Sequence, residues 1–284
     1  LSYGPNITLD ATYSLNGGLT VDGIAANPPS LSPMGADFYL SASAGSSSVF
    51  FHTYGDSGSP TYFGARASGE GHFDAYTRAN YHGSFTSGAA APAPFLFSFY
   101  VQQGEVGVSG IGDGMAELLL KLQVNTGSGF NTVVQDSTKI TRASGVVSCL
   151  DVDFGLATPY MKCDSPSSST AIGNGALYTV NLGLINPGQT FAIDYDIIAT
   201  VSGNGIDSSG SCGGGEGYGD LVGLTSANGD GYGGCATSFA VARSGDPFDG
   251  QPDTNPGVFQ ASIPEPGSLA LAALALGGLA AARR

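Results

Sequence analysis

The strongest constraint in this sequence is the alternation of apolar and polar residues over long stretches. In residues 6–16, NITLDATYSLN, the apolar side chains of Ile7 and Leu9 are separated by Thr8 and followed by Asp10. A period of two places successive side chains on opposite faces of an extended chain, as in a half-buried β-strand. The same alternation recurs in four further stretches, residues 71–83, 93–103, 115–125 and 176–203.

The pattern predicts an all-β fold. Gly, Ser, Asn and Pro clusters separate roughly a dozen such strands, and Asn186-Pro187-Gly188 is a strong turn signal between two of them. Residues 115–125, MAELLLKLQVN, contain many helix-favouring residues, but their alternation favours a strand. We therefore expect residues 1–243 to form an antiparallel β-sandwich, jelly-roll-like, followed by a short C-terminal apolar helix.

The charge balance excludes one class of partner. The 284 residues contain 23 Asp and Glu against 9 Lys and Arg, which gives a net charge of −14. Nucleic-acid phosphates are bound by clustered Lys and Arg, and no basic patch is visible. We therefore expect no nucleic-acid partner, and a surface suited to solubility outside the cell.

The four cysteines predict disulfides. Among three possible connectivities we favour Cys149–Cys163 and Cys212–Cys235, because each joins cysteines that are near in sequence. A zinc site is the rival interpretation, but the spacing lacks a pair of cysteines two to four residues apart, and no histidine is near. Disulfides indicate an oxidising compartment. No signal peptide is visible after Leu1, so we expect that it has been removed or that the sequence lacks its start.

The glycine-rich stretch between Cys212 and Cys235 raises the question of a cofactor. Asp220, Asn228 and Asp230 are weak candidates for an irregular calcium site, since carboxylate and amide oxygens are calcium ligands. The spacing does not match an EF-hand, because Phe239 stands where the bidentate glutamate would be. A surface loop closed by a disulfide is the favoured interpretation, and we expect no other cofactor.

Candidate catalytic residues are few, and we expect no enzymatic activity. Paired carboxylates can hydrolyse glycosides when they flank the bond about 5–9 Å apart, and a histidine beside an aspartate can bind a metal. The favoured interpretation is that all of these residues lie on the solvent faces of amphipathic strands. They are the pairs Asp151 and Asp153, Asp194 and Asp196, and His72 and Asp74 with His82 further along.

The composition changes from residue 244 to the end of the sequence. Residues 244–262 are rich in Pro and Asp and are expected to form a stiff linker. Residues 267–282 carry no charge, and as a helix they would span about 24 Å, less than the ~30 Å of a bilayer core. Pro264-Glu265-Pro266 precede this segment and cannot continue a helix, whereas Arg283 and Arg284 would stay on the cytoplasmic side.

Residues 263–284 resemble the PEP-CTERM sorting signal, in which Pro-Glu-Pro, a short apolar helix and terminal arginines follow in this order. The resemblance implies export from a Gram-negative bacterium, with residues 267–282 held transiently in the inner membrane. It also implies recognition of Pro264, Glu265 and Pro266 by a membrane-embedded processing enzyme, exosortase, with Arg283 and Arg284 as the stop signal. The body would then reach the cell surface or the extracellular matrix.

We expect the body to be structural or adhesive. The alternative is a polysaccharide-binding or polysaccharide-degrading module, because sandwiches commonly present sugar sites on a face of a sheet. A cleft with two carboxylates would favour degradation. Exposed aromatic side chains on a sheet face would favour binding, and the candidates are Tyr39, Tyr62, Tyr76 and Tyr100.

Overall fold

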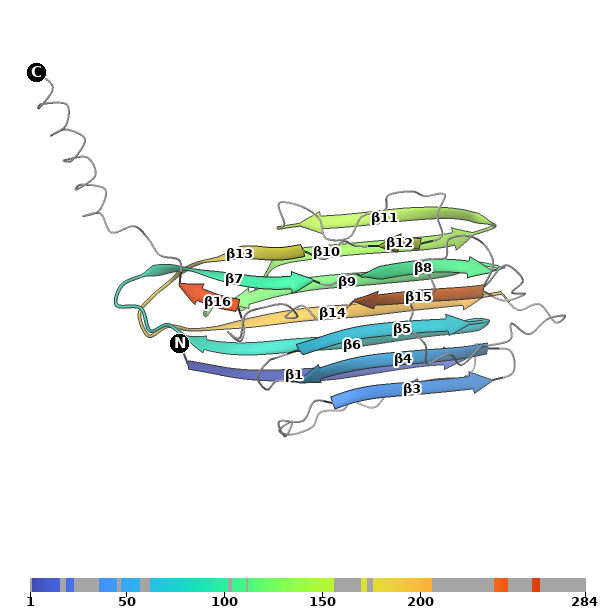
Figure 1. Ribbon diagram of the computed structural model, residues 1–284, viewed down its shortest axis with the longest axis horizontal. Coiled ribbons are helices and arrows are strands. Elements are labelled where there is room, and N and C mark those ends of the chain that lie inside the picture. The colour runs from blue at the N-terminus through green and yellow to red at the C-terminus, as the bar shows by residue number, and fades with distance from the viewer. Residues whose placement is uncertain are drawn as a thin grey trace, which may run out of the picture.

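The computed structural model describes most of the body, and every regular element within that part is a β-strand (Figure 1). No described segment forms a helix that is long and apolar enough to cross a membrane. The residues that the structure describes are 2–15, 19–22, 36–44, 47–56, 62–101, 104–110, 112–155, 170–172, 176–205, 238–244 and 257–260.

The largest sheet is antiparallel and has seven strands. Its centre is the pair β14–β6, which are the two longest strands and are hydrogen-bonded along their whole length. In spatial order the strands are β11 (Val146–Phe154), β10 (Phe130–Ala143), β9 (Gly114–Asn125), β14 (Thr190–Asn204), β6 (His72–Thr86), β1 (Ser2–Leu15) and β2 (Leu19–Asp22).

Two smaller antiparallel sheets lie over the large one (Figure 1). Strands β4 and β5 of the six-stranded sheet pack on β6, and β15 packs on β14. The six-stranded sheet contains, in order, β12 (Thr170–Ile172), β8 (Glu105–Gly110), β15 (Ser238–Ser244), β5 (Tyr62–Glu70), β4 (Ser47–Asp56) and β3 (Ala36–Ala44). The three-stranded sheet contains β13 (Ala176–Ile185), β7 (Ala93–Val101) and β16 (Gly257–Gln260).

The core lies between the layers and is rich in aromatic rings. Tyr195 of β14 contacts Phe63 of the six-stranded sheet edge-on at 5.6 Å and Phe99 of the three-stranded sheet at 5.3 Å, measured between ring centroids. Phe191, four residues earlier on the same face, stacks on Phe85 at 5.3 Å and contacts Phe95 at 5.6 Å. All six rings are fully buried, so each contributes apolar burial of about 2 kcal/mol as well as ring contacts.

Glycine makes room for these rings where the sheets approach. Gly69 of β5 faces Phe73 of β6 across the interface, and a Cβ atom built on Gly69 would lie 2.3 Å from the Phe73 ring. The absence of a side chain at residue 69 therefore allows Phe73 to lie against the backbone of the facing sheet. Phe73 is itself fully buried, so it has no free space into which it can move.

The structure confirms the all-β prediction and the antiparallel pairing. Residues 115–125 are strand rather than helix, and a hydrogen bond of 3.1 Å from the Gln189 amide to the Asn186 carbonyl closes the predicted turn. The strand order differs from a jelly roll, because β3, β4 and β5 form one meander and β9, β10 and β11 another, rather than two interleaved Greek keys.

The predicted linker needs a correction at its C-terminal end. Residues Gly257–Gln260 form β16, which pairs with β7 from Gly257 opposite Ser98 to Gln260 opposite Phe95. This part of 244–262 therefore belongs to the folded body, because its backbone supplies ladder hydrogen bonds to the three-stranded sheet. The predicted C-terminal helix over 267–282 lies outside the described residues.

The close approach at Gly69 predicts a selective loss of stability. We expect Gly69→Ala to lower the free energy of unfolding by about 1–3 kcal/mol, because the new methyl group forces Phe73 out of a packed position. Chemical denaturation measures this. Gly114→Ala is the matched control, since a Cβ there meets its nearest neighbour at an ordinary 3.5 Å. Equal effects of the two substitutions would contradict the packing argument.

Candidate functional site

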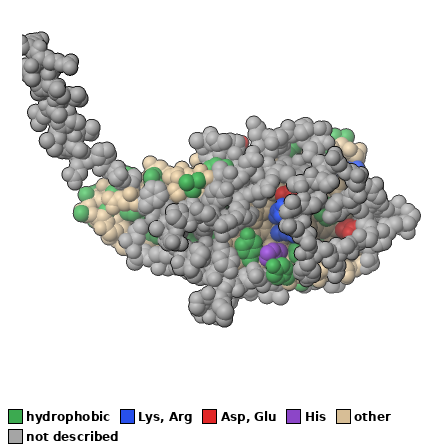
Figure 2. Space-filling model, viewed as in Figure 1, with side chains coloured by type: hydrophobic (Ala, Val, Ile, Leu, Met, Phe, Trp, Pro, Cys, Tyr) green, Lys and Arg blue, Asp and Glu red, His purple; other side chains and the backbone are tan. Residues whose placement is uncertain are grey.

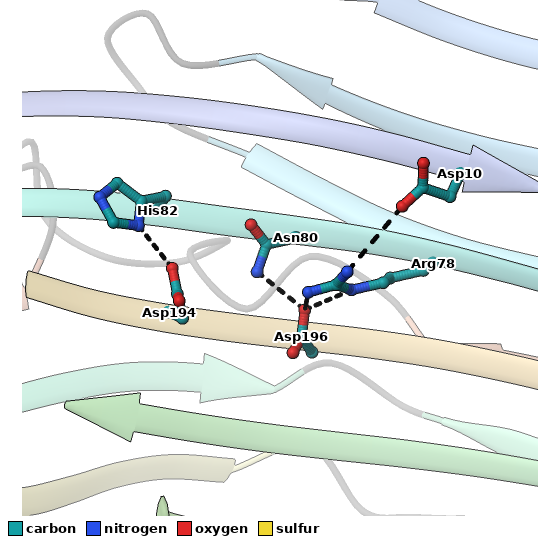
Figure 3. Close-up of polar contacts among 6 residues, drawn as sticks. All are labelled: Asp10, Arg78, Asn80, His82, Asp194 and Asp196. Atoms are coloured by element: carbon teal, nitrogen blue, oxygen red, sulfur yellow. Dashed lines mark hydrogen bonds and ion pairs between the residues drawn. The ribbon is translucent and has the colours of Figure 1, made fainter. Parts of the chain in front are cut away.

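Polar side chains gather on the outer face of the seven-stranded sheet. Because β6 and β14 place their odd-numbered residues in the core, their even-numbered residues project away from it. The register sets His82 opposite Asp194 and Asn80 opposite Asp196, and it sets Arg78 opposite Asp10 of β1. Figure 3 shows these side chains converging across the three strands.

Asp196 is the centre of this group. Its Oδ1 atom accepts hydrogen bonds from Arg78 Nε and Asn80 Nδ2 at 2.7 and 2.8 Å, and Arg78 Nη2 lies 2.7 Å from the same oxygen. The Asp196 side chain is only 7% exposed, although it lies on the outer face. Asp10 Oδ2 lies 3.9 Å from Arg78 Nη1 and completes the ion-pair network.

The network changes the acid–base behaviour of its members. Burial lowers the pKa of the Arg78 guanidinium, but the charge of Asp196 and its hydrogen bond outweigh this, so the pKa is raised. Burial also raises the pKa of the Tyr76 hydroxyl; Arg78 opposes this shift, and Asp10 and Asp196 add to it. Arg78 therefore stays charged and Tyr76 stays neutral at physiological pH, as a structural ion-pair network requires.

Asp194, the other aspartate on β14, also has a side-chain partner. Asp194 Oδ1 lies 2.6 Å from His82 Nδ1, and the His82 ring contacts Phe130 edge-on at 6.2 Å. Each carboxylate thus has its own partner on β6, and the two do not face each other across a cleft. Asp194 and Asp196 lie on the outer face of the sheet, as predicted. Asp196 is nevertheless nearly buried rather than solvated, because Arg78 and Asn80 cover its carboxylate and bond to it.

The other predicted site residues lie apart. Asp74 accepts a hydrogen bond of 3.4 Å from Ser14, and His72 lies at the start of β6, opposite Asn204. Asp151 and Asp153 lie at the β11 edge. Within the described part of the chain, no three His, Cys, Asp or Glu side chains form a group that could hold a metal ion.

The predicted calcium and disulfide residues fall mostly outside the described residues. Asp220, Asn228 and Asp230 lie there, as do Cys163, Cys212 and Cys235, so the calcium site and both pairings stay predictions. Cys149 is half-buried on β11 and is not a free thiol. The sorting residues Pro264, Glu265, Pro266, Arg283 and Arg284 also lie outside the described part.

A second surface lies on the outer face of the six-stranded sheet. We call the side chains of Tyr39, Phe50, His52 and Tyr54 the aromatic strip. Tyr39 of β3 is 53% exposed and stacks on His52 of β4, with ring centroids 4.1 Å apart and planes 11° from parallel. Figure 2 shows hydrophobic, histidine and Lys/Arg side chains gathered on this face. Of the predicted aromatic candidates, Tyr39 lies here.

Sequence reasoning missed the rest of this surface. Phe50, His52 and Tyr54 share one face of β4, and the alternation in SVFFHTYG contains this signal. Tyr76 lies instead on the opposite sheet beside Arg78, and the side chains of Tyr62 and Tyr100 are outside the described part. The sequence does not show which strand lies next to β4, and that neighbour creates the ring stack.

The buried position of Asp196 predicts that Arg78 stabilises the fold. We expect Arg78→Ala to lower the free energy of unfolding by about 3 kcal/mol, because it leaves a nearly buried carboxylate without its cation. Chemical denaturation tests this. Lys139→Ala is the control: Lys139 pairs with Glu117 at 3.4 Å but is 38% exposed, so its loss should cost less than about 1 kcal/mol. A cost for Arg78→Ala as small as the control's would refute a structural role for the network.

Comparison with known proteins identifies one segment of the chain. Residues 262–284 match the family model of the PEP-CTERM protein-sorting motif, which confirms the resemblance drawn from Pro264, Glu265 and Pro266. No curated protein and no solved structure matches the chain. The motif is a substrate signal for exosortase-type processing and marks export to the cell surface. The chain is therefore an all-β body that carries a PEP-CTERM protein-sorting motif over residues 262–284.

Proposed function

We propose that this chain is a surface or extracellular-matrix protein of a Gram-negative bacterium, with a structural or adhesive role and without catalysis. The observation that carries the proposal is the sorting motif at residues 262–284. Exosortase recognises Pro264, Glu265 and Pro266 while residues 267–282 lie in the inner membrane. The body then passes to the cell surface or into the matrix.

The geometry of the body supports a role without catalysis. A general acid or nucleophile needs a carboxylate that can reach a substrate, whereas Asp196 is nearly buried and bonded to Arg78 and Asn80. Asp194 is likewise held by His82 at 2.6 Å. These contacts join neighbouring strands, so they strengthen the sheet and leave no pair of free carboxylates at its centre.

The composition supports a place outside the cell. A net charge of −14 keeps the chain soluble, and disulfides at Cys149–Cys163 and Cys212–Cys235 would persist in an oxidising compartment. Calcium bound by Asp220, Asn228 and Asp230 would fit the same environment, but the proposed function does not require it.

Polysaccharide binding is the second candidate function, and one observation favours it. The half-exposed ring of Tyr39 lies on a sheet face beside three further rings, where apolar side chains of a soluble protein are usually scattered. Nothing in the network around Asp196 favours polysaccharide degradation, because its carboxylates are already paired.

The sorting role predicts a separable tail. Deleting residues 263–284 should abolish processing and delivery to the cell surface while leaving the body folded, because the described core uses no residue after Gln260. Cell fractionation and intact mass measure processing, and circular dichroism measures folding.

A matched variant separates recognition from membrane insertion. Replacing Pro264, Glu265 and Pro266 by alanine keeps the apolar segment and should still block cleavage. If the deleted chain unfolds, or if the triple-alanine chain is cleaved as the wild type is, the tail does not act as a sorting signal.

The predicted compartment can be checked through the cysteines. We expect the exported protein to migrate faster on a denaturing gel without reductant than with it, because two closed loops make the unfolded chain more compact. Thiol counting on denatured, unreduced protein should find none of the four cysteines reactive. Four reactive thiols would contradict export into an oxidising compartment.

A further inference from the structure

The aromatic strip is a continuous surface that two strands build together. Phe50, His52 and Tyr54 project from the same face of β4 at every second residue, and the register sets Tyr39 of β3 directly opposite His52. The ring of His52 lies 4.1 Å from Tyr39 and 5.1 Å from Tyr54, and Tyr39 lies 6.4 Å from Phe50. Every ring therefore contacts a neighbour, which holds the strip in one arrangement.

The Tyr54 ring packs closely against the neighbouring strand because residue 64 of that strand is a glycine. Gly64 of β5 pairs with Tyr54, and a Cβ atom built on Gly64 would lie 2.5 Å from both Cζ and the hydroxyl oxygen of Tyr54. The ring therefore leans across β5 with its hydroxyl end close to the backbone. Tyr54 is half-buried in this position.

An arginine row extends the strip on the β5 side. Arg66 pairs with His52 across β4 and β5, and its guanidinium carbon lies 5.0 Å from the centre of the Phe50 ring. Arg243 follows on β15, and its Nε donates a hydrogen bond of 2.8 Å to the buried carboxylate of Glu105. Stacking on Phe50 restrains Arg66, whose half-buried guanidinium lies beside the rings.

Tyr39 is the most exposed member and has one open face. His52 covers the other face in a nearly parallel stack, so the 53% exposure of Tyr39 comes from the opposite face and from the hydroxyl edge. The strip therefore presents the exposed ring of Tyr39 and the partly exposed ring of Tyr54, and the half-buried side chains of His52 and Arg66 lie beside them. Figure 2 shows this mixture of hydrophobic and cationic side chains on one face.

This combination matches one ligand chemistry best. The C–H bonds on one face of a pyranose sugar are weakly positive and pack on the negative face of an aromatic ring, while its hydroxyl groups accept and donate hydrogen bonds at the rim. Nucleobases also stack on aromatic rings, but a net charge of −14 repels their phosphates. A standard protein interface buries about 800 Å² of each partner, whereas Tyr39 is the only one of these four side chains that is mostly exposed.

We infer that the aromatic strip is a binding site for a polysaccharide chain of pyranose rings, with Tyr39 and Tyr54 as stacking platforms. The inference deepens the second candidate function and rests on it. Tyr39 lies on β3 opposite His52, and Tyr54 follows His52 along β4, so a chain stacked on both tyrosines would pass from β3 to β4 at an angle to the strands.

The test uses the full chain and immobilised polysaccharide. Binding to beads that carry a neutral β-glucan, a galactomannan, a polyuronate, or polysaccharide extracted from the matrix of the native host is measured over a protein concentration series. We expect at least one of the four to retain the wild-type chain. Tyr39→Ala should weaken that binding about tenfold, the loss of one stacking contact.

Gly64→Ala is the second and sharper variant. It removes no ligand contact, but its methyl group pushes the Tyr54 ring off the sheet, so it should weaken binding while changing stability little. Phe130→Ala is the matched control, because Phe130 is an exposed ring on the opposite sheet, and it should bind as the wild type does. Circular dichroism confirms that all three variants fold.

The outcomes separate this inference from the proposed function. Wild-type chain that is retained by none of the four polysaccharides, or variants of Tyr39 and Gly64 that bind as tightly as the wild type, would overturn the inference. Equal weakening by Phe130→Ala would overturn it too. Export and cleavage of the same variants are scored in cells, where Tyr39→Ala should be processed normally; loss of processing in the wild type would instead refute the sorting role.

Discussion

The aromatic packing around Tyr195 is the contact on which the rest of the molecule depends. This one side chain touches Phe63 of the six-stranded sheet and Phe99 of the three-stranded sheet, so it joins all three sheets at one place. Phe191, on the same strand, stacks on Phe85 of the neighbouring strand β6 and contacts Phe95 of the three-stranded sheet. Because the odd-numbered residues of β14 lie in this core, its even-numbered residues project outward.

The side chains on both outer surfaces are set by this alternation between core-facing and outward-facing residues. On the large sheet, polar side chains project outward from β6 and β14. Arg78 and Asn80 donate hydrogen bonds to Asp196, so these groups pair with one another. On the six-stranded sheet, the outward residues of β4 are aromatic and remain partly open. The same alternation thus produces one face whose polar side chains bond to one another and one face whose aromatic rings stay partly exposed.

The sequence predicted the parts of this structure that depend on local pattern. Alternation identified the strands, including residues 115–125, and the order of Pro264, Glu265 and Pro266 before an apolar segment identified the sorting motif. The sequence did not show which residues pair across strands. Arg78 and Asp196 are 118 residues apart, and only the register of β6 with β14 brings them together. The pairing of β16 was also hidden, because a Pro- and Asp-rich composition predicts a linker.

The position of β16 limits how far the folded body can lie from the sorting motif. Its last residue, Gln260, is hydrogen-bonded into the three-stranded sheet, and Pro264 follows four residues later with three residues between them. An extended chain covers at most about 3.5 Å per residue, so the motif stays within about 14 Å of the folded edge. A body held this close to the sorting motif can reorient relative to it only over a small range. In the proposed route, in which residues 267–282 lie in the bilayer, the three-stranded sheet would stay near the lipid head groups, and the processing enzyme would have to act within this short distance.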